Sequence, residues 1–583
     1  MHFYGFLSNG HTAALVGPDT SIDWFPYPRF DSPSVLTRIL GGRRHGFFAV
    51  AWDGPAKVTQ RYLDGTNVIE TRVGEGAQAA SITDFLDPKG PVLCRALAAG
   101  RPLRLHLKLA FDYGLVPAAV RATARGLDLR HPLEPLHLEL VVRNLKGRPL
   151  PPPRLGSSEE IVWALRPGRY LVELGAVGHN RGPEETVATA AHHWRRRQIP
   201  YDGPHPEAFA RSALVLQGLT YAPTHAVIAA PTTSLPEEVG GTRQWDYRYT
   251  WIRDAAYVAE AWTGAGALEA ARATLAFLLN RVAPEAAPFD APLVRVDGSL
   301  VPAERDLEWL PGHAGSWPCR EGNGAADQRQ LDIEGDLLAS LHRYLEASDD
   351  WDFAAEHWPR IVRLVEWSGA HWRERDASLW EFRGQDAHYT HSKLMCWVAL
   401  DRGARIGRRL GHGQQALRWE QEALRVRAAI ERWGTDPSGD HYVQRFGGSA
   451  VDAALLLLPL YEYCAVDAPR FQATLQRIET DLVDNGWVYR YRRDMFGAAA
   501  HPFVLANTWL ARVYWRQGRT AEAARALEPV LAARTSLGLL GEHVDQATGV
   551  PRGNFPQAFS HLGILQALSE MAAVPAQGRL QPV

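Results

Sequence analysis

The chain has 583 residues, 46% of them hydrophobic, and its 63 lysines and arginines nearly balance 65 aspartates and glutamates, which gives a net charge of −2. This length and apolar fraction exclude a small stapled scaffold and favour several domains with large packed cores. Nucleic-acid binding needs clustered basic residues to neutralise phosphates, and the balanced charge without a dense basic block therefore predicts no nucleic-acid partner.

The cysteines and the N-terminus constrain the cellular setting. The four cysteines lie far apart and form no CxxC pair, so neither a zinc site nor a disulfide framework is indicated, and we expect no metal and no cofactor. The first ten residues lack a basic start followed by an apolar run, and no segment reaches the roughly 18 apolar residues of a membrane span. We expect a cytoplasmic protein without a membrane partner; its oligomeric state stays open.

The first part of the chain has the period of β-strands. Between about residues 58 and 174, leucines alternate with polar residues, as in Leu103, Leu105 and Leu107 with Arg104 and His106 between them. Such alternation places one face on a core and the other in water, as in antiparallel strands. Short strands separated by Gly/Pro turns favour a sandwich over a barrel. We predict an N-terminal antiparallel β-sandwich over residues 1–200.

After about Pro206 the apolar residues follow the helical period. We expect helices near 206–221, 254–282, 331–348, 356–374, 391–411, 415–434, 449–464, 468–483, 501–518, 520–535 and 557–573. These are too many helices for a four-helix bundle, and no fixed repeat of 34–45 residues is visible, so a closed double ring of paired helices is favoured over a solenoid. The predicted division is a linker with a helix at 201–230 and a helical domain at 231–583.

One loop before a helix concentrates aromatic and charged residues. Between Gly240 and Asp254 the chain contains Tyr247, Trp251 and the pair Arg253-Asp254. An arginine–aspartate pair can hold adjacent sugar hydroxyls while an indole stacks on the sugar ring. A purely structural alternative is an aspartate that caps the helix within an aromatic cluster.

Two further loops each supply a carboxylate. In Leu379-Trp380-Glu381-Phe382, Glu381 stands between large aromatics, and burial of a carboxyl group favours its protonated form, as a general acid requires. Gly541-Glu542 places a second carboxylate in a loop between helices. Either glutamate can instead be an ordinary turn residue. A fourth loop around Trp317 is typical of the mouth of a pocket, although a core tryptophan fits equally well.

Several of these strings resemble family 15 glycoside hydrolases, the bacterial and archaeal glucoamylase and trehalase group, over nearly the whole chain. The resemblance rests on Ser21-Ile22-Asp23-Trp24 and Pro28-Arg29-Phe30-Asp31-Ser32-Pro33 in the β part, on Ala230-Pro231-Thr232-Thr233-Ser234-Leu235-Pro236-Glu237-Glu238, and on the run from Trp245 to Asp254.

The resemblance implies a β-sandwich followed by an (α/α)6 barrel, and exo-acting hydrolysis of terminal α-glucosyl residues with inversion. It implies that Glu381 is the general acid and Glu542 the general base, with carboxyl groups roughly 6.5–9.5 Å apart. The substrate-binding residues it implies are Tyr247, Trp251, Arg253, Asp254, Trp317, Trp380 and Arg490, or Arg492 in place of Arg490 if the alignment slips by two.

The chain departs from the family pattern at two places. The family's Gln-Leu-Asp-Val-Tyr-Gly-Glu appears as Gln330-Leu331-Asp332-Ile333-Glu334-Gly335-Asp336, and His501-Pro502 precedes Phe503 in place of Glu-Gly. We expect Glu334, Asp336 and His501 to lie near the pocket, where the leaving group is recognised.

We therefore predict a glucoamylase-like enzyme that releases β-glucose from short α-glucosides, with α-1,4 or α-1,6 linkages slightly favoured. A trehalase of the same family is the first alternative. A sugar-sensing module that kept the barrel is the second, although such a module would be expected to lose one of the glutamates. A phosphorylase would need a phosphate pocket in place of Glu542. The expected partner is a small α-linked glucoside or oligosaccharide.

Overall fold

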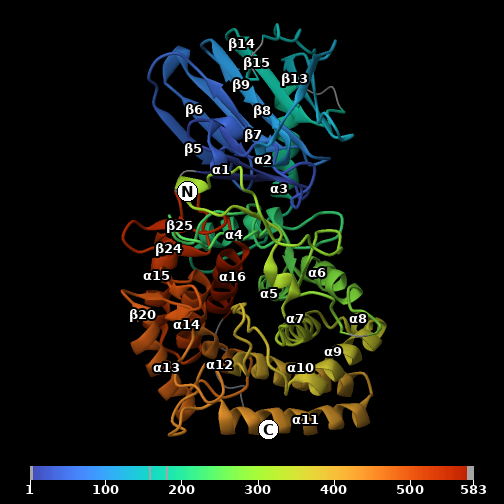
Figure 1. The fold of residues 1–583 in the computed structure, drawn as a ribbon, viewed down its shortest axis with the longest axis vertical. Helices are drawn as coiled ribbons and strands as arrows, with labels where there is room; N and C mark the ends of the chain where they lie inside the picture. Colours follow the sequence, from blue (N-terminus) through green and yellow to red (C-terminus); the bar gives the residue numbers. More distant parts are fainter. Residues whose placement is uncertain (1–3, 157–158, 179–181, 286, 574–583) are drawn as a thin grey trace.

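The computed structural model describes residues 4–156, 159–178, 182–285 and 287–573. Strands fill the first part of the chain and helices the second, stacked along the long axis of the molecule (Figure 1). One antiparallel sheet consists, in spatial order, of β1 (Gly5–Ser8), β2 (Ala13–Val16), β3 (Ile22–Trp24), β4 (Phe47–Ala51), β9 (Leu103–Lys108) and β14 (Ile161–Leu165). The other consists of β11 (Ala119–Ala122), β12 (Leu127–Arg130), β13 (His137–Asn144), β15 (Gly168–Gly175), β8 (Val92–Ala99), β7 (Ala80–Leu86), β6 (Ile69–Val73) and β5 (Val58–Tyr62).

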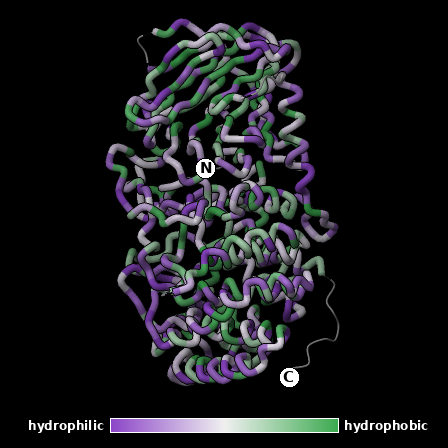
Figure 2. The backbone as a smooth tube through the Cα atoms, turned by 90° about the vertical axis from the view of Figure 1, so that its right-hand side faces the viewer, coloured by the Kyte–Doolittle hydropathy of each residue, from purple (hydrophilic) through white to green (hydrophobic). Residues whose placement is uncertain are grey.

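The predicted alternation matches the burial of these strands. In β9, Leu103, Leu105 and Leu107 are buried, whereas the polar residues between them are partly exposed. The backbone accordingly changes between hydrophobic and hydrophilic residues along the strands (Figure 2). A buried ion pair joins the two sheets, because Arg95 on β8 binds Asp84 on β7 over 2.8 Å and donates to the Phe48 carbonyl oxygen on β4 over 2.8 Å.

The helices of the second part form two concentric rings. The inner ring closes through successive packing of α5 (Ile252–Gly264), α7 (Ile333–Ser348), α10 (Thr390–Arg409), α12 (Leu457–Leu460), α14 (Val504–Arg516) and α16 (Ala558–Ala572). Outside them pack α4 (Pro206–Gly218), α6 (Leu268–Asn280), α9 (Trp358–His371), α11 (Gly413–Trp433), α13 (Pro469–Leu482) and α15 (Thr520–Ala532).

Burial explains which helices are inner and which outer. Every residue of α5 from Ile252 to Thr263 is buried, which suits a helix with neighbours on all sides, whereas α11 buries a single stripe. The helix α4, in the segment predicted as a linker, packs on α16 as an outer helix. The division of the chain at residues 200 and 230 stays a prediction. No helix in the described part of the chain is both long and apolar enough to cross a membrane.

Two helix predictions differ from the structure, and one further helix was not predicted. The expected helix at 254–282 is two helices, α5 and α6, separated at Gly266, whose φ of +77° a right-handed helix does not allow. The expected helix at 449–464 reduces to two short turns, Ala453–Leu456 and α12, with Pro459 close to the end of the second. The helix α3 (Pro183–Arg195) has no predicted counterpart and packs on the larger sheet.

Close packing of the inner ring yields a stability prediction at Gly335 on α7. A Cβ atom there would lie 2.2 Å from the Met395 carbonyl oxygen on α10, so we expect Gly335→Ala to destabilise the protein by about 1–3 kcal/mol. Gly369→Ala on α9 is the control, because its Cβ meets only ordinary contacts and alanine favours helix. Thermal unfolding should show a lower Tm for the first variant alone; equal Tm values would contradict the close approach of α7 and α10.

Candidate active site

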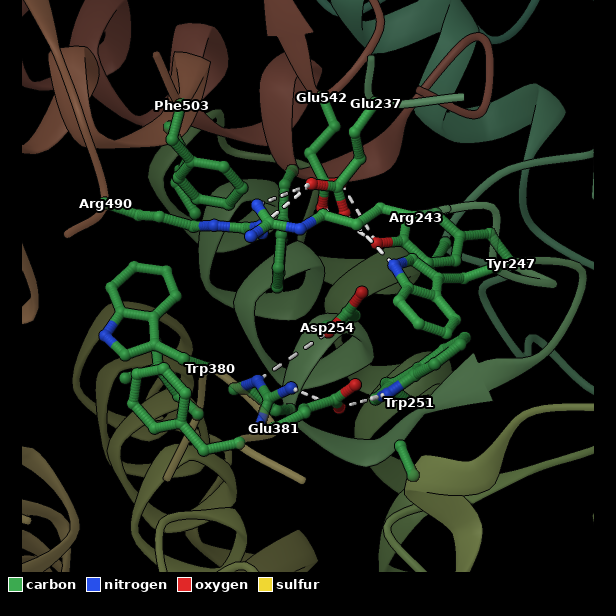
Figure 3. Close-up of a pocket in the computed structure, with 18 of the residues that line it drawn as sticks. Glu237, Arg243, Tyr247, Trp251, Asp254, Trp380, Glu381, Arg490, Phe503 and Glu542 are labelled. Carbon is green, nitrogen blue, oxygen red and sulfur yellow. Dashed lines mark hydrogen bonds and ion pairs between the residues drawn. The ribbon is translucent and has the colours of Figure 1, made fainter. Parts of the chain in front are cut away.

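All the predicted site residues except Trp317 meet in a pocket at the end of the barrel where the inner helices begin. Asp254 lies in the first turn of α5, Glu381 precedes α10, Phe503 precedes α14, and Glu542 lies in the loop before α16. The pocket is lined by polar and aromatic side chains from segments far apart in the chain (Figure 3). Helix N-termini carry partial positive charge, so this end of the barrel favours carboxylates.

Among the described residues, Glu381 is held through one of its two carboxyl oxygens. Its Oε1 accepts hydrogen bonds from Trp251 Nε1 over 2.7 Å and from Arg253 over 3.1 Å, and from Gln330 Nε2 over 3.2 Å. The remaining oxygen is therefore available to carry a proton. The backbone of Glu381 is left-handed, with a φ of +59°, a conformation that costs a non-glycine residue about 1–2 kcal/mol and is concentrated at functional sites.

Glu542 has a different set of partners. The Tyr247 hydroxyl donates to it, at 3.0 Å from Oε2 and 3.3 Å from Oε1. His543 donates from Nδ1 to the Pro502 carbonyl oxygen over 3.0 Å, and its Nε2 lies 3.4 Å from Glu542 Oε2. The Tyr247 hydroxyl thus orients the carboxyl group, and the His543 ring lies beside it. Figure 3 shows Glu542 and Glu381 on opposite sides of the pocket with Asp254 between them.

Arg253 and Asp254 form the floor between the two glutamates. Arg253 donates to Gln330 over 2.8 Å and to Asp332 over 3.0 Å. Asp254 is 3% exposed, and its Oδ1 has no hydrogen-bond partner among the described residues. Burial raises the pKa of Asp254 well above its ordinary value. The N-cap residue of the helix is Trp251, and Asp254 lies in the first turn. The oxygen without a donor is a ready partner for a sugar hydroxyl.

Of the other predicted binding residues, Trp380 and Arg490 line the pocket and Arg492 does not. Trp380 lines the pocket, and its Nε1 donates to Asp452 over 2.7 Å. Arg490 lines the pocket and donates to Glu237 over 2.8 Å, whereas Arg492 is exposed and binds the Asp481 carbonyl oxygen. The structure thus brings Arg490, and not Arg492, into the pocket.

Trp317 is not among the pocket-lining residues. Its side chain is 50% exposed. The neighbouring segment does reach the site, because Asn323 lines the pocket and Arg320 stacks over the Trp245 ring at 4.5 Å. The role predicted for Trp317 over the substrate therefore has no support in its position.

Sequence reasoning missed several residues that hold the site together. Glu237 accepts from Trp245 over 3.1 Å and from Arg490, and Arg490 and Arg243 help keep its pKa low although burial alone would raise it. Gln330 and Asp332 anchor Arg253. A signal for all three was present, because each lies within a string that resembles the family.

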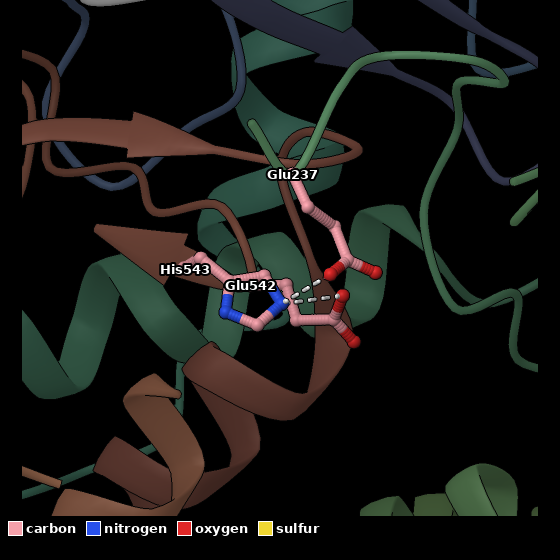
Figure 4. Close-up of side chains that lie close together, drawn as sticks. All are labelled: Glu237, Glu542 and His543. Carbon is pink, nitrogen blue, oxygen red and sulfur yellow. Dashed lines mark ion pairs between the residues drawn. The ribbon is translucent and has the colours of Figure 1, made fainter. Parts of the chain in front are cut away.

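Three carboxylate and imidazole groups lie close enough to hold one metal ion. The ligand atoms of Glu237, Glu542 and His543 are all within 4.8 Å of one another (Figure 4). Two neighbours already serve these carboxylates, since Arg490 binds Glu237 and Tyr247 binds Glu542. We therefore interpret the group as one that orients Glu542, and the expected absence of a metal stays a prediction.

The expectation that Glu334 and Asp336 lie where a leaving group is recognised is wrong, whereas His501 does lie near the pocket. Glu334 and Asp336 are buried in α7, do not line the pocket, and Asp336 faces the Tyr461 hydroxyl at 3.5 Å. Asp336 lies one helical turn after Asp332, further from the open end of the barrel. His501 lines a small adjoining cavity beside His543, outside the main pocket. Glu334 and Asp336 therefore do not contact a leaving group in that pocket, and the role of His501 stays a prediction.

Comparisons with known proteins agree with this architecture. A model of the glycosyl hydrolases family 15 matches residues 203–569, and a model of trehalase-like N-terminal domains matches residues 2–141. Trehalase 2 of Sulfolobus acidocaldarius is 37% identical over 580 residues, which cover 98% of this chain and 100% of that protein. The trehalase of Mycobacterium tuberculosis is 33% identical, with 97% of this chain and 88% of that protein covered.

A solved structure confirms the fold. A bacterial glucoamylase complexed with acarbose matches with a TM-score of 0.71 at 14% identity and covers 98% of this chain and 94% of that chain. The predicted fold class, an antiparallel β-sandwich followed by an (α/α)6 barrel, is thereby confirmed, as is the family resemblance of the sequence.

The buried position of Glu334 leads to a prediction about pH. Burial raises its pKa to about 8, and its Oε2 has no partner among the described residues. The unfolded chain releases this proton near pH 4.5, so the folded protein loses stability as the pH rises from there toward 8. Glu334→Gln should therefore match the wild type near pH 4.5 and exceed it increasingly up to about pH 8. Tm values of both proteins across this range check the prediction; a constant difference would refute it.

Proposed function

The chain belongs to glycosyl hydrolases family 15 and is a glycoside hydrolase, and from this membership we propose that it cleaves terminal α-glucosidic bonds with inversion. Glu381 is the general acid and Glu542 the general base. The observation that carries these roles is the different hydrogen bonding of the two carboxyl groups. Three donors bind a single oxygen of Glu381, whereas the Tyr247 hydroxyl lies within hydrogen-bond distance of both oxygens of Glu542.

The reaction follows from this placement. The terminal glucosyl unit occupies the pocket with its outer hydroxyls toward Asp254, which has an oxygen free to accept them. The second oxygen of Glu381 donates its proton to the glycosidic oxygen as the bond to the anomeric carbon breaks. A water held by Glu542 attacks that carbon from the opposite face and gives its proton to Glu542. The products are β-glucose and the released alcohol.

The neighbours of each glutamate suit its role. Oε1 of Glu381 is fixed by an indole and an arginine, which leaves the other oxygen as the proton carrier and stabilises the negative charge that remains after proton transfer. Glu542 must stay ionised to accept a proton, and the Tyr247 hydroxyl and the His543 ring both face its carboxylate. Trp380 and Trp251 supply aromatic walls for the sugar ring.

We propose α,α-trehalose as the substrate, ahead of α-1,4- and α-1,6-linked disaccharides. The relatives named trehalase align with 97–98% of the chain, and the match of the N-terminal part is to a trehalase-like domain. The lining of the pocket supports a second polar sugar, because it includes Arg243, Arg383 and Asp494 together with Gln328. A small disaccharide is thus the proposed partner of the site.

The stereochemistry of the products tests the mechanism. Early proton NMR spectra of a trehalose digest should show equal amounts of α- and β-glucose, because the attacked unit inverts and the leaving unit keeps its α configuration. Maltose should give β-glucose at the newly formed anomeric carbon. Release of α-glucose alone in the first turnovers would reject inversion, whereas cleavage of maltose but not trehalose would reject only the proposed substrate.

The two glutamates can be told apart by the leaving group. Proton donation typically contributes about 10²–10⁴-fold in rate, so Glu381→Gln should lose about that much kcat on trehalose. It should lose far less on α-glucosyl fluoride, whose leaving group needs little protonation. Glu542→Gln should be impaired on both substrates.

The control for this comparison is Glu346→Gln, an exposed position on α7. It should behave as the wild type on both substrates in steady-state kinetics. Equal losses of Glu381→Gln on trehalose and on the fluoride would contradict its role as the acid.

A further inference from the structure

A tyrosine of the β-sandwich reaches into the polar network beneath the active site. Tyr113 belongs to α2 (Phe111–Gly114), where Asp112 and Tyr113 both have left-handed backbones with φ of +52° and +57°. Such a conformation costs about 1–2 kcal/mol for each non-glycine residue and persists only where the surroundings impose it. Here the Tyr113 N–H donates to the Ser34 carbonyl oxygen over 3.1 Å, and Trp309 Nε1 donates to the Tyr113 carbonyl oxygen over 3.3 Å.

The side chain of Tyr113 contacts two charged residues of the barrel part. Its hydroxyl donates to Glu321 over 2.9 Å and accepts from Arg248 over 2.6 Å. The side chain is 1% exposed, and burial raises its pKa well above the ordinary value, so the hydroxyl keeps its proton as a donor. One donor and one acceptor role are thus both used.

Arg248 connects Tyr113 to the segment 245–249, which contains Tyr247. Its guanidinium is fully buried and binds both carboxyl oxygens of Asp246, over 2.8 and 2.6 Å. It also donates to the Ser32 carbonyl oxygen, a second contact from the β-sandwich, over 2.6 Å. Asp246 is further fixed by the Gly322 N–H over 3.2 Å.

Asp246 lies between two residues of the pocket. The segment is extended, with the Ser234 N–H bound to the Trp245 carbonyl oxygen and the Ala230 N–H bound to the Tyr247 carbonyl oxygen. Successive side chains of an extended segment point to opposite sides. Trp245 and Tyr247 therefore face the pocket, while Asp246 and Arg248 face the β-sandwich.

We propose that Tyr113 is a positioning residue for the active site: through Arg248 and Asp246 it fixes the loop that presents the Tyr247 hydroxyl to Glu542. The inference rests on the proposed function, in which Glu542, hydrogen-bonded to Tyr247, holds the attacking water. The β-sandwich then contributes to catalysis through a defined hydrogen-bond chain, in addition to stabilising the barrel.

The test compares Tyr113→Phe with Tyr62→Phe. Tyr62 is also a buried tyrosine of the β-sandwich whose hydroxyl makes two hydrogen bonds, one to the Phe6 carbonyl oxygen over 2.8 Å and one from the Phe6 N–H over 3.0 Å. Each variant loses two hydrogen bonds, but of the two tyrosines only Tyr113 is connected to the segment 245–249. Steady-state kinetics on trehalose and on α-glucosyl fluoride should show kcat lowered about tenfold for Tyr113→Phe, with KM within about twofold. Tyr62→Phe should keep the wild-type kcat.

A second variant and a second measurement keep the inference decidable. Arg248→Lys cannot bind Asp246 through two nitrogens, and the double variant with Tyr113→Phe should lose less than the product of the single effects, because both act through one chain of contacts. Hydrogen–deuterium exchange of the amides at 245–249 should be faster in Tyr113→Phe and unchanged in Tyr62→Phe.

Wild-type kcat together with wild-type exchange in Tyr113→Phe would overturn the inference, as would equal kcat losses in the two tyrosine variants. If the wild-type protein hydrolysed no α-glucoside, the proposed function would fail. The exchange of residues 245–249 would still show whether Tyr113 holds the loop.

Discussion

The closure of the inner helix ring is the constraint on which the site depends. Helices such as α5, buried almost all round, need neighbours on every side, and six of them satisfy this need by closing on one another. Closure brings the segments that precede these helices to one end of the barrel. Asp254, Glu381 and Glu542 are far apart in the chain and meet there for this reason. The segments that precede the inner helices then need only carry suitable side chains.

Inside the pocket, charge is placed by pairing. Arg253 forms ion pairs with Asp332 and Glu381, and Arg490 forms an ion pair with Glu237. Buried charges are costly unless they are paired and hydrogen-bonded, so these pairs allow several carboxylates to share a small volume. Asp254 Oδ1 accepts no hydrogen bond from the described residues, although Arg253 Nε lies 3.9 Å away, and in the proposed mechanism a sugar hydroxyl supplies the missing hydrogen bond.

Much of this arrangement can be predicted from the sequence, and the remainder fails for identifiable reasons. The alternation at Leu103–Leu107 and the helical periods depend on local pattern, and the glutamates lie in strings that resemble the family. Glu237 was missed because its role depends on Arg490, which is 253 residues away. Glu334 was misplaced because proximity to Asp332 in the sequence says nothing about which side of α7 a residue occupies. In the same way, the sequence around Trp317 does not show which way this loop residue points, and its side chain does not line the pocket.

The left-handed backbone at Glu381 implies a trade-off between the proposed function of this residue and the stability of the folded protein. A protein selected only for stability would have glycine at this position, since glycine adopts a positive φ without steric cost. On the proposed function, the glutamate is kept there because its carboxyl group donates the proton. Any search for heat-resistant variants that ignores turnover would therefore be drawn to position 381 and would select against the enzyme's own chemistry.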